Sequence, residues 1–129
     1  HSPHRVREGR PERLAPRFDG FLEADGVVRL ATPIVHGCVI AARPIGVLMM
    51  EDESGQDEKL LCVPVDKLHP LYKDVKSTSD LQPIILEQIA HFFEHYKDLE
   101  SGKWVKVVGW EGPEKAAEMI QAAMDRAAK

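Results

Sequence analysis

Two carboxylates and a lysine in the acidic segment 51–59 are the residues that most clearly suggest chemistry. Asp52 and Asp57 lie on either side of its centre, and Lys59 follows two residues after Asp57. In a strand, residues two apart lie on one face, so Asp57 and Lys59 would point the same way. Two carboxylates can hold a hydrated Mg²⁺ whose shell includes a phosphate oxygen, which the lysine would meet as a point charge. The spacing favours a magnesium and phosphate site, and a solvated acidic turn is the structural alternative.

Two apolar runs flank this segment and would position it. Residues 45–50 and 60–65 have the length and branching of strands, with Ser54-Gly55 as the turn between them. Cross-strand neighbours lie roughly 5–6 Å apart, which would bring the side chains of Asp52 and Asp57 close together. The sequence therefore predicts a β-hairpin with carboxylates at its tip.

A second candidate for phosphate binding is the pair Tyr96-Lys97, at the end of a predicted helix. The carbonyl groups at the C-terminus of a helix repel anions, so a phosphate there needs added positive charge and a hydroxyl group. Lys97 and Tyr96 supply both, and Lys103 follows just past the turn. A lysine that only complements the helix dipole is the structural alternative.

The segment His91-Phe92-Phe93-Glu94-His95 matches the H-x-x-E-H pattern of inverted zinc proteases. Histidines at positions i and i+4 share one face of a helix. No third ligand stands out, although His69 or Asp98 could be argued. We therefore interpret the two histidines as helix residues at the edge of the core or at a subunit contact, in preference to a zinc site.

Composition limits the class of protein. A chain of 129 residues predicts one domain, and its formal net charge of −4 does not suggest nonspecific nucleic-acid binding. No apolar run approaches the roughly 20 residues that a membrane span needs, and the Arg-rich start lacks the apolar region of a signal peptide. We therefore expect a cytoplasmic protein, in which Cys38 and Cys62 are buried, reduced thiols.

The first part of the chain differs from the rest. Residues 1–20 are rich in arginine and proline and have few apolar side chains, so we expect a flexible arm before a domain at 21–129. A short strand is predicted at 27–30, after an Asp25-Gly26 turn. Arg43-Pro44 predicts an edge, a bulge or a break in the next strand, because proline lacks the N–H that a ladder needs.

Two helices and a strand are predicted in the second half. The first helix would be capped by Ser79 or Asp80 and end at Ser101-Gly102, with its apolar face on a sheet. Residues 103–110 alternate as a strand. A final helix at 114–128 would turn inward Ala117, Ile120, Ala123 and Met124. Strands, helix, strand and helix around one sheet indicate an α+β fold.

Four segments of the chain are informative when their order and spacing are considered together. They are Arg43-Pro44-Ile45-Gly46-Val47-Leu48, Asp52-Glu53-x-Gly55-x-Asp57-x-Lys59, Gln88-Ile89-x-His91-Phe92-Phe93-x-His95-Tyr96-Lys97-Asp98-Leu99-Glu100, and Lys103-Trp104-Val105-Lys106-Val107 with Gly109-Trp110. Together they resemble the C-terminal part of the soluble, Mg²⁺-dependent (family I) inorganic pyrophosphatases of bacterial type. The resemblance runs from about Gly37 to the end of the chain.

The resemblance implies an OB-like antiparallel β-barrel of five strands, here incomplete on its N-terminal side and flanked by two C-terminal helices. It also implies hydrolysis of pyrophosphate to two phosphates by a Mg²⁺-activated water. Carried over by position, Asp52 and Asp57 would be Mg²⁺ ligands. Lys59, Tyr96 and Lys97 would hold phosphate oxygens, and together with Asp52 they would form the catalytic set.

The resemblance further implies a homohexamer, with His91, His95 and Asp98 at a subunit contact. Upstream of this region the family carries a D-G-D-P-x-D cluster of further metal ligands, which Asp19-Gly20 and Asp25-Gly26 do not reproduce. We therefore expect a chain that is weakly active or inactive on its own. A non-enzymatic oligomerisation module with the same fold is the alternative.

Overall fold

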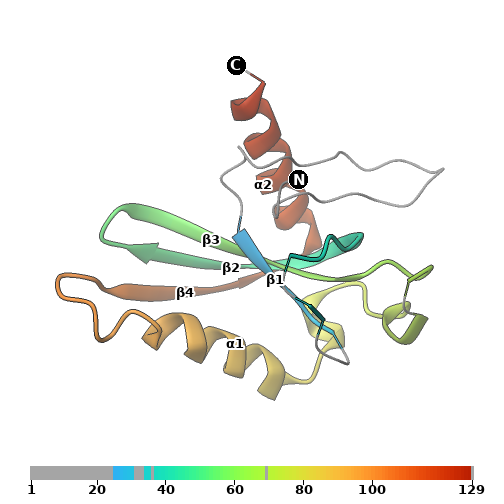
Figure 1. Cartoon of the computed structure of the whole chain (residues 1–129), viewed down its shortest axis with the longest axis horizontal. Coiled ribbons are helices and arrows are strands. Elements are labelled where there is room, and N and C mark those ends of the chain that lie inside the picture. The colour runs from blue at the N-terminus through green and yellow to red at the C-terminus, as the bar shows by residue number, and fades with distance from the viewer. Residues whose placement is uncertain (1–24, 31–33, 36, 69, 129) are drawn as a thin grey trace.

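The computed structural model describes residues 25–30, 34–35, 37–68 and 70–128. The predicted arm at 1–20 lies outside these residues. The elements are β1 (Asp25–Val28), β2 (Ala42–Asp52), β3 (Gly55–Pro64), the 3-10 turns η1 (Pro70–Tyr72) and η2 (Thr78–Asp80), α1 (Pro83–His95), β4 (Val105–Glu111) and α2 (Pro113–Ala127) (Figure 1). This order confirms the predicted α+β class.

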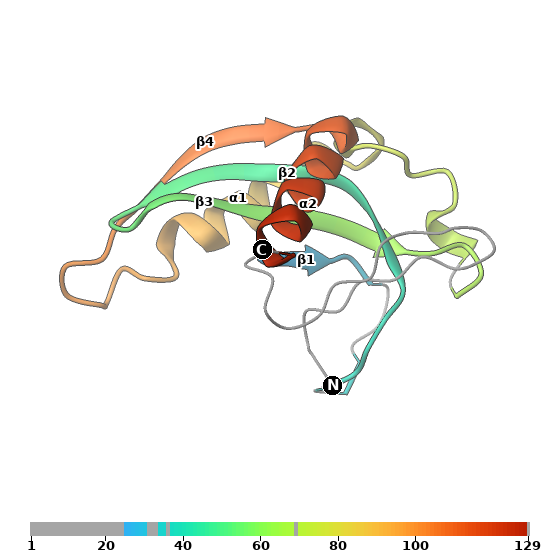
Figure 2. The same ribbon diagram turned by 90° about the horizontal axis from the view of Figure 1, so that it is seen from above.

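The described strands form one sheet in the order β1-β3-β2-β4. β2 pairs antiparallel with both β3 and β4, whereas β1 runs parallel to β3. The described sheet is therefore mixed, and the parallel pairing of β1 corrects the expectation that all strands are antiparallel. β1 and β4 lie at opposite edges, so this part of the chain forms an open sheet, in which β2 and β3 curve together (Figure 2).

The central hairpin agrees with the prediction, except that its turn is formed by Glu53 and Ser54 rather than by Ser54 and Gly55, and Gly55 already begins β3. Asp52 pairs with Gly55 across the turn, and Gly55 has a φ of 115°, which side chains other than glycine rarely adopt. The pairing of β2 with β3 shifts between Pro44 and Gly46, which is the bulge predicted from the missing proline N–H. The hairpin is thus regular from its tip back to Gly46.

One helix covers each face of the sheet (Figure 1). On one face, α2 buries Ala116, Ile120 and Ala123 against strand residues that include Val47 and Leu60. The expectation that Ala117 faces inward was wrong, because the buried positions recur at i, i+4 and i+7 from Ala116 and turn the next residue towards solvent.

The other face of the sheet carries α1. Its packing partners include Ile45, Leu61 and Val63 of the strands and the side chain of Tyr72. This helix faces the side of the hairpin that bears Asp52, so the fold brings the end of α1 to the hairpin tip.

The ends of α1 differ from the prediction. The helix starts at Pro83 with Gln82 as its N-cap, because proline is tolerated at the first helical position. Asp80 instead belongs to η2, where its carboxylate accepts the backbone N–H groups of Lys76 and Ser77. The helix ends at His95, so residues 96–104 form a connection to β4 rather than a last helical turn.

The two cysteines have different environments. Cys62 is buried in the sheet, and burial raises the pKa of its thiol to about 12. Cys38 is exposed, contrary to expectation, because it precedes the first residue of β2 and lies outside the sheet. Neither described helix is long and apolar enough to cross a membrane.

Candidate active site

The hairpin register sets three of the predicted site residues on one face. Asp52 pairs with Gly55 and Asp57 with Met50, so their side chains are diagonal neighbours on the same side of the sheet. Lys59 lies two residues further along β3 on that side. This is also the side of the sheet that α1 covers.

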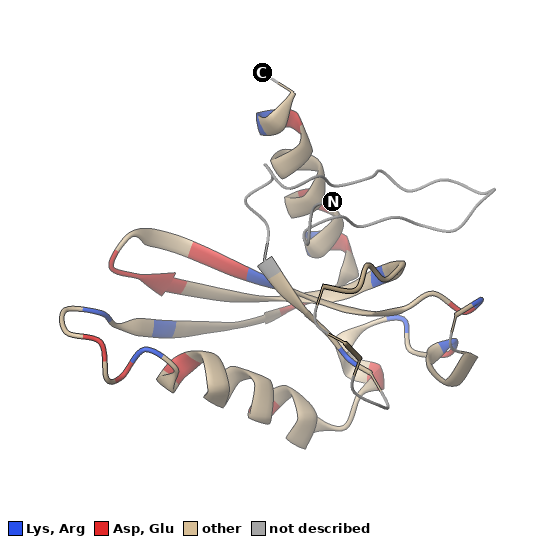
Figure 3. Cartoon of the chain, viewed as in Figure 1, with Lys and Arg blue, Asp and Glu red and all other residues tan. Residues whose placement is uncertain are grey.

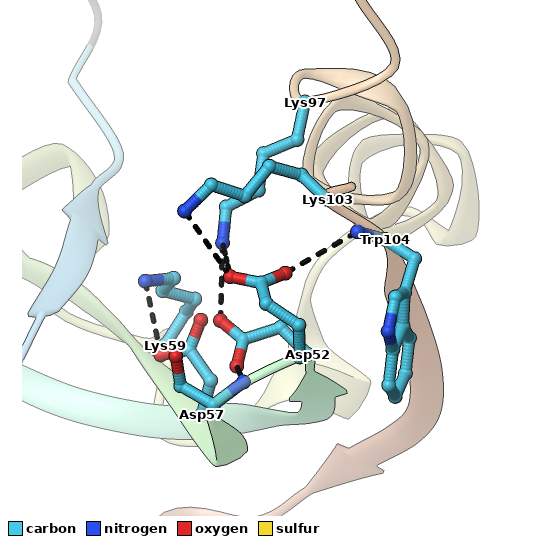
Figure 4. Close-up of polar contacts among 8 residues, drawn as sticks. Asp52, Asp57, Lys59, Lys97, Lys103 and Trp104 are labelled. Atoms are coloured by element: carbon cyan, nitrogen blue, oxygen red, sulfur yellow. Dashed lines mark hydrogen bonds and ion pairs between the residues drawn. The ribbon is translucent and has the colours of Figure 1, made fainter. Parts of the chain in front are cut away.

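Lys97 joins the end of α1 to the hairpin tip (Figure 4). Its Nζ lies 3.0 Å from Oδ2 of Asp52 and 3.8 Å from Oε2 of Glu53. Tyr96 lies beside it, with the centre of its ring 5.6 Å from the Lys97 Nζ. The structure therefore brings the predicted phosphate-binding pair to the predicted metal-binding carboxylates.

Lys59 is the most buried charged residue in the described part of the site, with 7% of its surface exposed. Its Nζ lies 3.2 Å from Oδ1 of Asp57 and 5.6 Å from the centre of the Phe93 ring. A buried ammonium group needs such partners, because leaving water is costly for an isolated charge. Asp57 and Phe93 thus fix where this positive charge points.

Hydrogen bonds favour the charged forms of the Asp52–Lys97 pair. The bond from Lys97, followed by the backbone N–H of Ser54, lowers the pKa of Asp52 below its ordinary value of 3.8. The same contact with Asp52 raises the pKa of Lys97 above 10.5. At neutral pH, the site therefore presents an ionised carboxylate next to a charged ammonium group.

This pair is expected to contribute stability that is lost in acid. Because the folded state lowers the pKa of Asp52, its contribution is present above pH 3.8 and disappears as the pH falls through the folded-state value. Urea unfolding of the wild type and of Asp52→Asn should give a free-energy difference that is constant above about pH 5 and shrinks below pH 3.8. A difference that did not change with pH would contradict this assignment.

Acidic and basic residues alternate around the site. Figure 3 shows carboxylates at the end of the hairpin and basic residues in the neighbouring α1–β4 connection. Lys103 belongs to this connection, and its Nζ lies 3.5 Å from Oε2 of Glu53. Carboxylates beside ammonium groups can hold a cation and an anion together, as a metal–phosphate complex requires.

The donor chemistry fits a hydrated divalent ion better than an all-protein cage. Asp52 and Asp57 offer carboxylate oxygens on one face, and Mg²⁺ commonly uses one or two such ligands together with waters and phosphates. No group of three or more His, Cys, Asp or Glu residues suited to a metal occurs in the described ranges. The residues present therefore fit a site in which water and substrate supply the other ligands.

His91 and His95 lie in the last turns of α1. The rings of His91 and His95 are 4.5 Å apart, and Nδ1 of His95 lies 2.9 Å from Oδ2 of Asp98. All three residues are exposed. His69, one of the suggested third ligands for zinc, lies outside the described residues.

Sequence reasoning missed the role of two residues near the site. Phe93 was given no role of its own in the site, yet its ring lies next to the Lys59 ammonium group. Glu53 was not singled out, because alternation along a strand would direct it away from Asp52. At a turn that alternation stops, so neighbouring side chains can reach the same partner, as both do with Lys97.

The sequence of this chain is similar to those of known proteins. The family model described as inorganic pyrophosphatase matches residues 23–128. Among curated relatives, the inorganic pyrophosphatase of Caulobacter vibrioides is 58% identical over 116 residues, which cover 90% of this chain and 64% of the relative. That of Pseudomonas aeruginosa is 56% identical over 114 residues, or 88% of this chain and 63% of the relative. The chain thus spans a little under two thirds of these relatives.

Solved structures of inorganic pyrophosphatases are also similar to this chain. The inorganic pyrophosphatase of Helicobacter pylori superimposes with a TM-score of 0.80 at 45% identity, covering 82% of this chain and 62% of that one. The inorganic pyrophosphatase of Coxiella burnetii gives a TM-score of 0.79 at 38% identity, covering 85% of this chain and 69% of that one. Fold and sequence therefore agree on the relatives of this chain.

Proposed function

This chain belongs to the inorganic pyrophosphatase family, and we propose that it hydrolyses pyrophosphate to two phosphates in a Mg²⁺-dependent reaction. The observation that carries the proposal is the 3.0 Å contact between Lys97 Nζ and Asp52 Oδ2. This contact joins a carboxylate suited to a cation and an amine suited to a phosphate within one site. The names of the relatives support the same reaction.

In this proposal, Asp52 and Asp57 would hold Mg²⁺, which when bound lowers the pKa of a water and offsets phosphate charge. Lys59, Lys97 and the Tyr96 hydroxyl would hold phosphate oxygens. Without substrate, each lysine has a carboxylate partner within 3.2 Å. When substrate enters, each amine exchanges that carboxylate for a phosphate oxygen, so its charge keeps a partner throughout.

A phosphate-release assay tests the proposal. With pyrophosphate and Mg²⁺, we expect phosphate release that stops when EDTA removes the metal. The rate is expected to be low, because the described carboxylates offer only part of the donor set that a several-metal site uses. Circular dichroism on the same sample establishes that the chain is folded. No release from folded protein would contradict the proposal.

We also propose that the chain forms a homo-oligomer, a hexamer by family resemblance, through His91, His95 and Asp98. The exposure of these three side chains, two on α1 and Asp98 just beyond its end, supports this. His95 has Asp98 at 2.9 Å and Glu94 at 3.8 Å, whereas the His91 ring faces the His95 ring.

A sizing column provides the corresponding prediction. The wild type is expected to elute as an oligomer, and replacing His91, His95 and Asp98 together with alanine should shift it towards smaller species, because the proposed contact loses its side chains. A wild type that elutes as a monomer would exclude the proposed assembly.

The same two experiments address the alternative, an oligomerisation module without catalysis. An oligomer with no phosphate release would favour that module, whereas release would exclude it. No observation in the described residues favours the module over the enzyme. The cytoplasmic location expected from the sequence stays a prediction, which cell fractionation would check.

A further inference from the structure

Glu53 contacts three residues of the connection between α1 and β4. Its Oε1 accepts the backbone N–H of Trp104 at 3.2 Å, and its Oε2 lies 3.5 Å from Lys103 Nζ. The same Oε2 lies 3.8 Å from Lys97 Nζ. One side chain at the hairpin tip therefore reaches both the beginning and the end of the connection.

Little apolar burial holds this connection in place. Within residues 96–104 only Lys97 is even partly buried, and Leu99 is fully exposed. Its internal hydrogen bonds are short turns, such as Lys103 N–H to Glu100 O at 3.2 Å. The long-range polar contacts that the structure describes for this connection go to Asp52 and Glu53. Apart from the contacts of the Tyr96 ring with the Phe92 and Phe93 rings at its start, its placement therefore depends on these two neighbouring carboxylates.

Asp52 and Glu53 differ in the groups that they contact. Asp52 takes the shorter contact with Lys97 and faces the same side as Asp57. Glu53 accepts the backbone N–H of Trp104 and lies close to Lys103 Nζ. It is therefore already engaged by the connection, which suits it to a role as a holder of that connection.

We propose that Glu53 is a positioning residue, which clamps the α1–β4 connection to the hairpin tip and thereby sets the Lys97 ammonium group for phosphate binding. The role of Lys97 in phosphate binding rests on the proposed function, whereas the contact of Glu53 with the α1–β4 connection does not. The Trp104 N–H is the central contact, because it is the last amide before β4 begins at Val105. A clamp there fixes where the connection meets the sheet, and Lys97 lies at its other end.

Three variants test this inference in the full chain. Glu53→Ala removes every contact of the carboxylate, whereas Glu53→Gln keeps an oxygen that can accept the Trp104 N–H. Glu51→Gln is the matched control, because it removes the same charge from the same tip at an exposed residue that lies on the opposite side of β2 from Asp52. Hydrogen exchange of the Trp104 amide reports on the clamp, and calorimetry with Mg²⁺ and imidodiphosphate, a diphosphate that resists hydrolysis, reports on binding.

We expect Glu53→Ala to speed Trp104 exchange and to weaken imidodiphosphate binding, each about tenfold, because a misplaced amine loses its contact with phosphate. Glu53→Gln should stay within about threefold of the wild type in both measurements, since it keeps the hydrogen bond. In a Lys97→Met background, adding Glu53→Ala should change binding less than about twofold, because the residue acts through Lys97.

Two results would overturn the inference. One is wild-type Trp104 exchange in Glu53→Ala, which would show that the clamp does not hold the connection. The other is an equal loss of binding whether or not Lys97 is present, which would assign Glu53 a role independent of that lysine. If the wild type itself binds no imidodiphosphate, the proposed function fails, while Trp104 exchange and the NMR signal of the Lys97 amine still decide whether Glu53 positions the connection.

Discussion

Replacing Asp57 with asparagine is expected to reduce Mg²⁺-dependent phosphate release by at least about 100-fold while binding of the diphosphate persists. A neutral amide is a much weaker ligand for a divalent cation than a carboxylate. The amide oxygen can still accept a hydrogen bond from Lys59 Nζ, which lies 3.2 Å from Oδ1 of Asp57. Lys59 should therefore stay in place, and its positive charge, no longer offset, should favour an anion.

The separation of rate from binding makes this prediction specific. Steady-state kinetics should show the loss in kcat, and calorimetry with imidodiphosphate should show affinity within about threefold of the wild type. Glu58→Gln is the matched control, because Glu58 is the next residue of β3 and points to the opposite face of the sheet. It should retain wild-type rates.

Either of two results would contradict this assignment. If Asp57→Asn kept more than about a tenth of the rate, Asp57 would not be a required metal ligand. If rate and diphosphate binding fell together, the main task of Asp57 would be to order the buried Lys59 ammonium group rather than to bind the metal.

The hairpin is the part of this fold that local sequence determines. Branched apolar runs correctly predicted the two strands, and Pro44 correctly predicted an irregularity in β2. The turn between the strands lies one residue before the predicted Ser54-Gly55. The strand direction of β1 is different. The sequence predicted a strand at 27–30 after a turn at Asp25-Gly26, whereas β1 spans Asp25–Val28 and includes both of those residues. A local pattern also contains no information about the neighbouring strand, so the parallel pairing with β3 was not foreseen.

The site, like the fold, has some features that local sequence predicts and others that depend on tertiary packing. The common face of Asp57 and Lys59 follows from strand alternation alone. The contact between Lys97 and Asp52 joins residues 45 positions apart and depends on how α1 packs against the sheet. No local pattern predicts such a contact, and only the resemblance to a family suggested it. Glu53 was missed because the turn geometry that directs its side chain exists only in three dimensions.

The second large effect is expected at Gly46, where the fold has no room for a side chain. A Cβ at this position would overlap Cγ2 of Thr78 in η2 and would lie 2.8 Å from the carbonyl oxygen of Glu111 in β4. Gly46 also adjoins the bulge in β2, so the strand cannot easily shift away. We expect Gly46→Ala to destabilise the chain by about 2–3 kcal/mol, as overpacking of a filled core does.

Thr78→Ser separates the two clashes at Gly46. Serine lacks the Cγ2 atom, so in a Gly46→Ala background it should restore part of the free energy of unfolding, measured in urea. It should not restore all of it, because the Glu111 carbonyl is backbone and stays close to the new methyl group. Full recovery would mean that the β4 backbone yields readily, and no recovery would mean that the approach of η2 to β2 is not what excludes a side chain here. Wild-type stability in Gly46→Ala alone would show that the close packing of β2, β4 and η2 does not hold in solution.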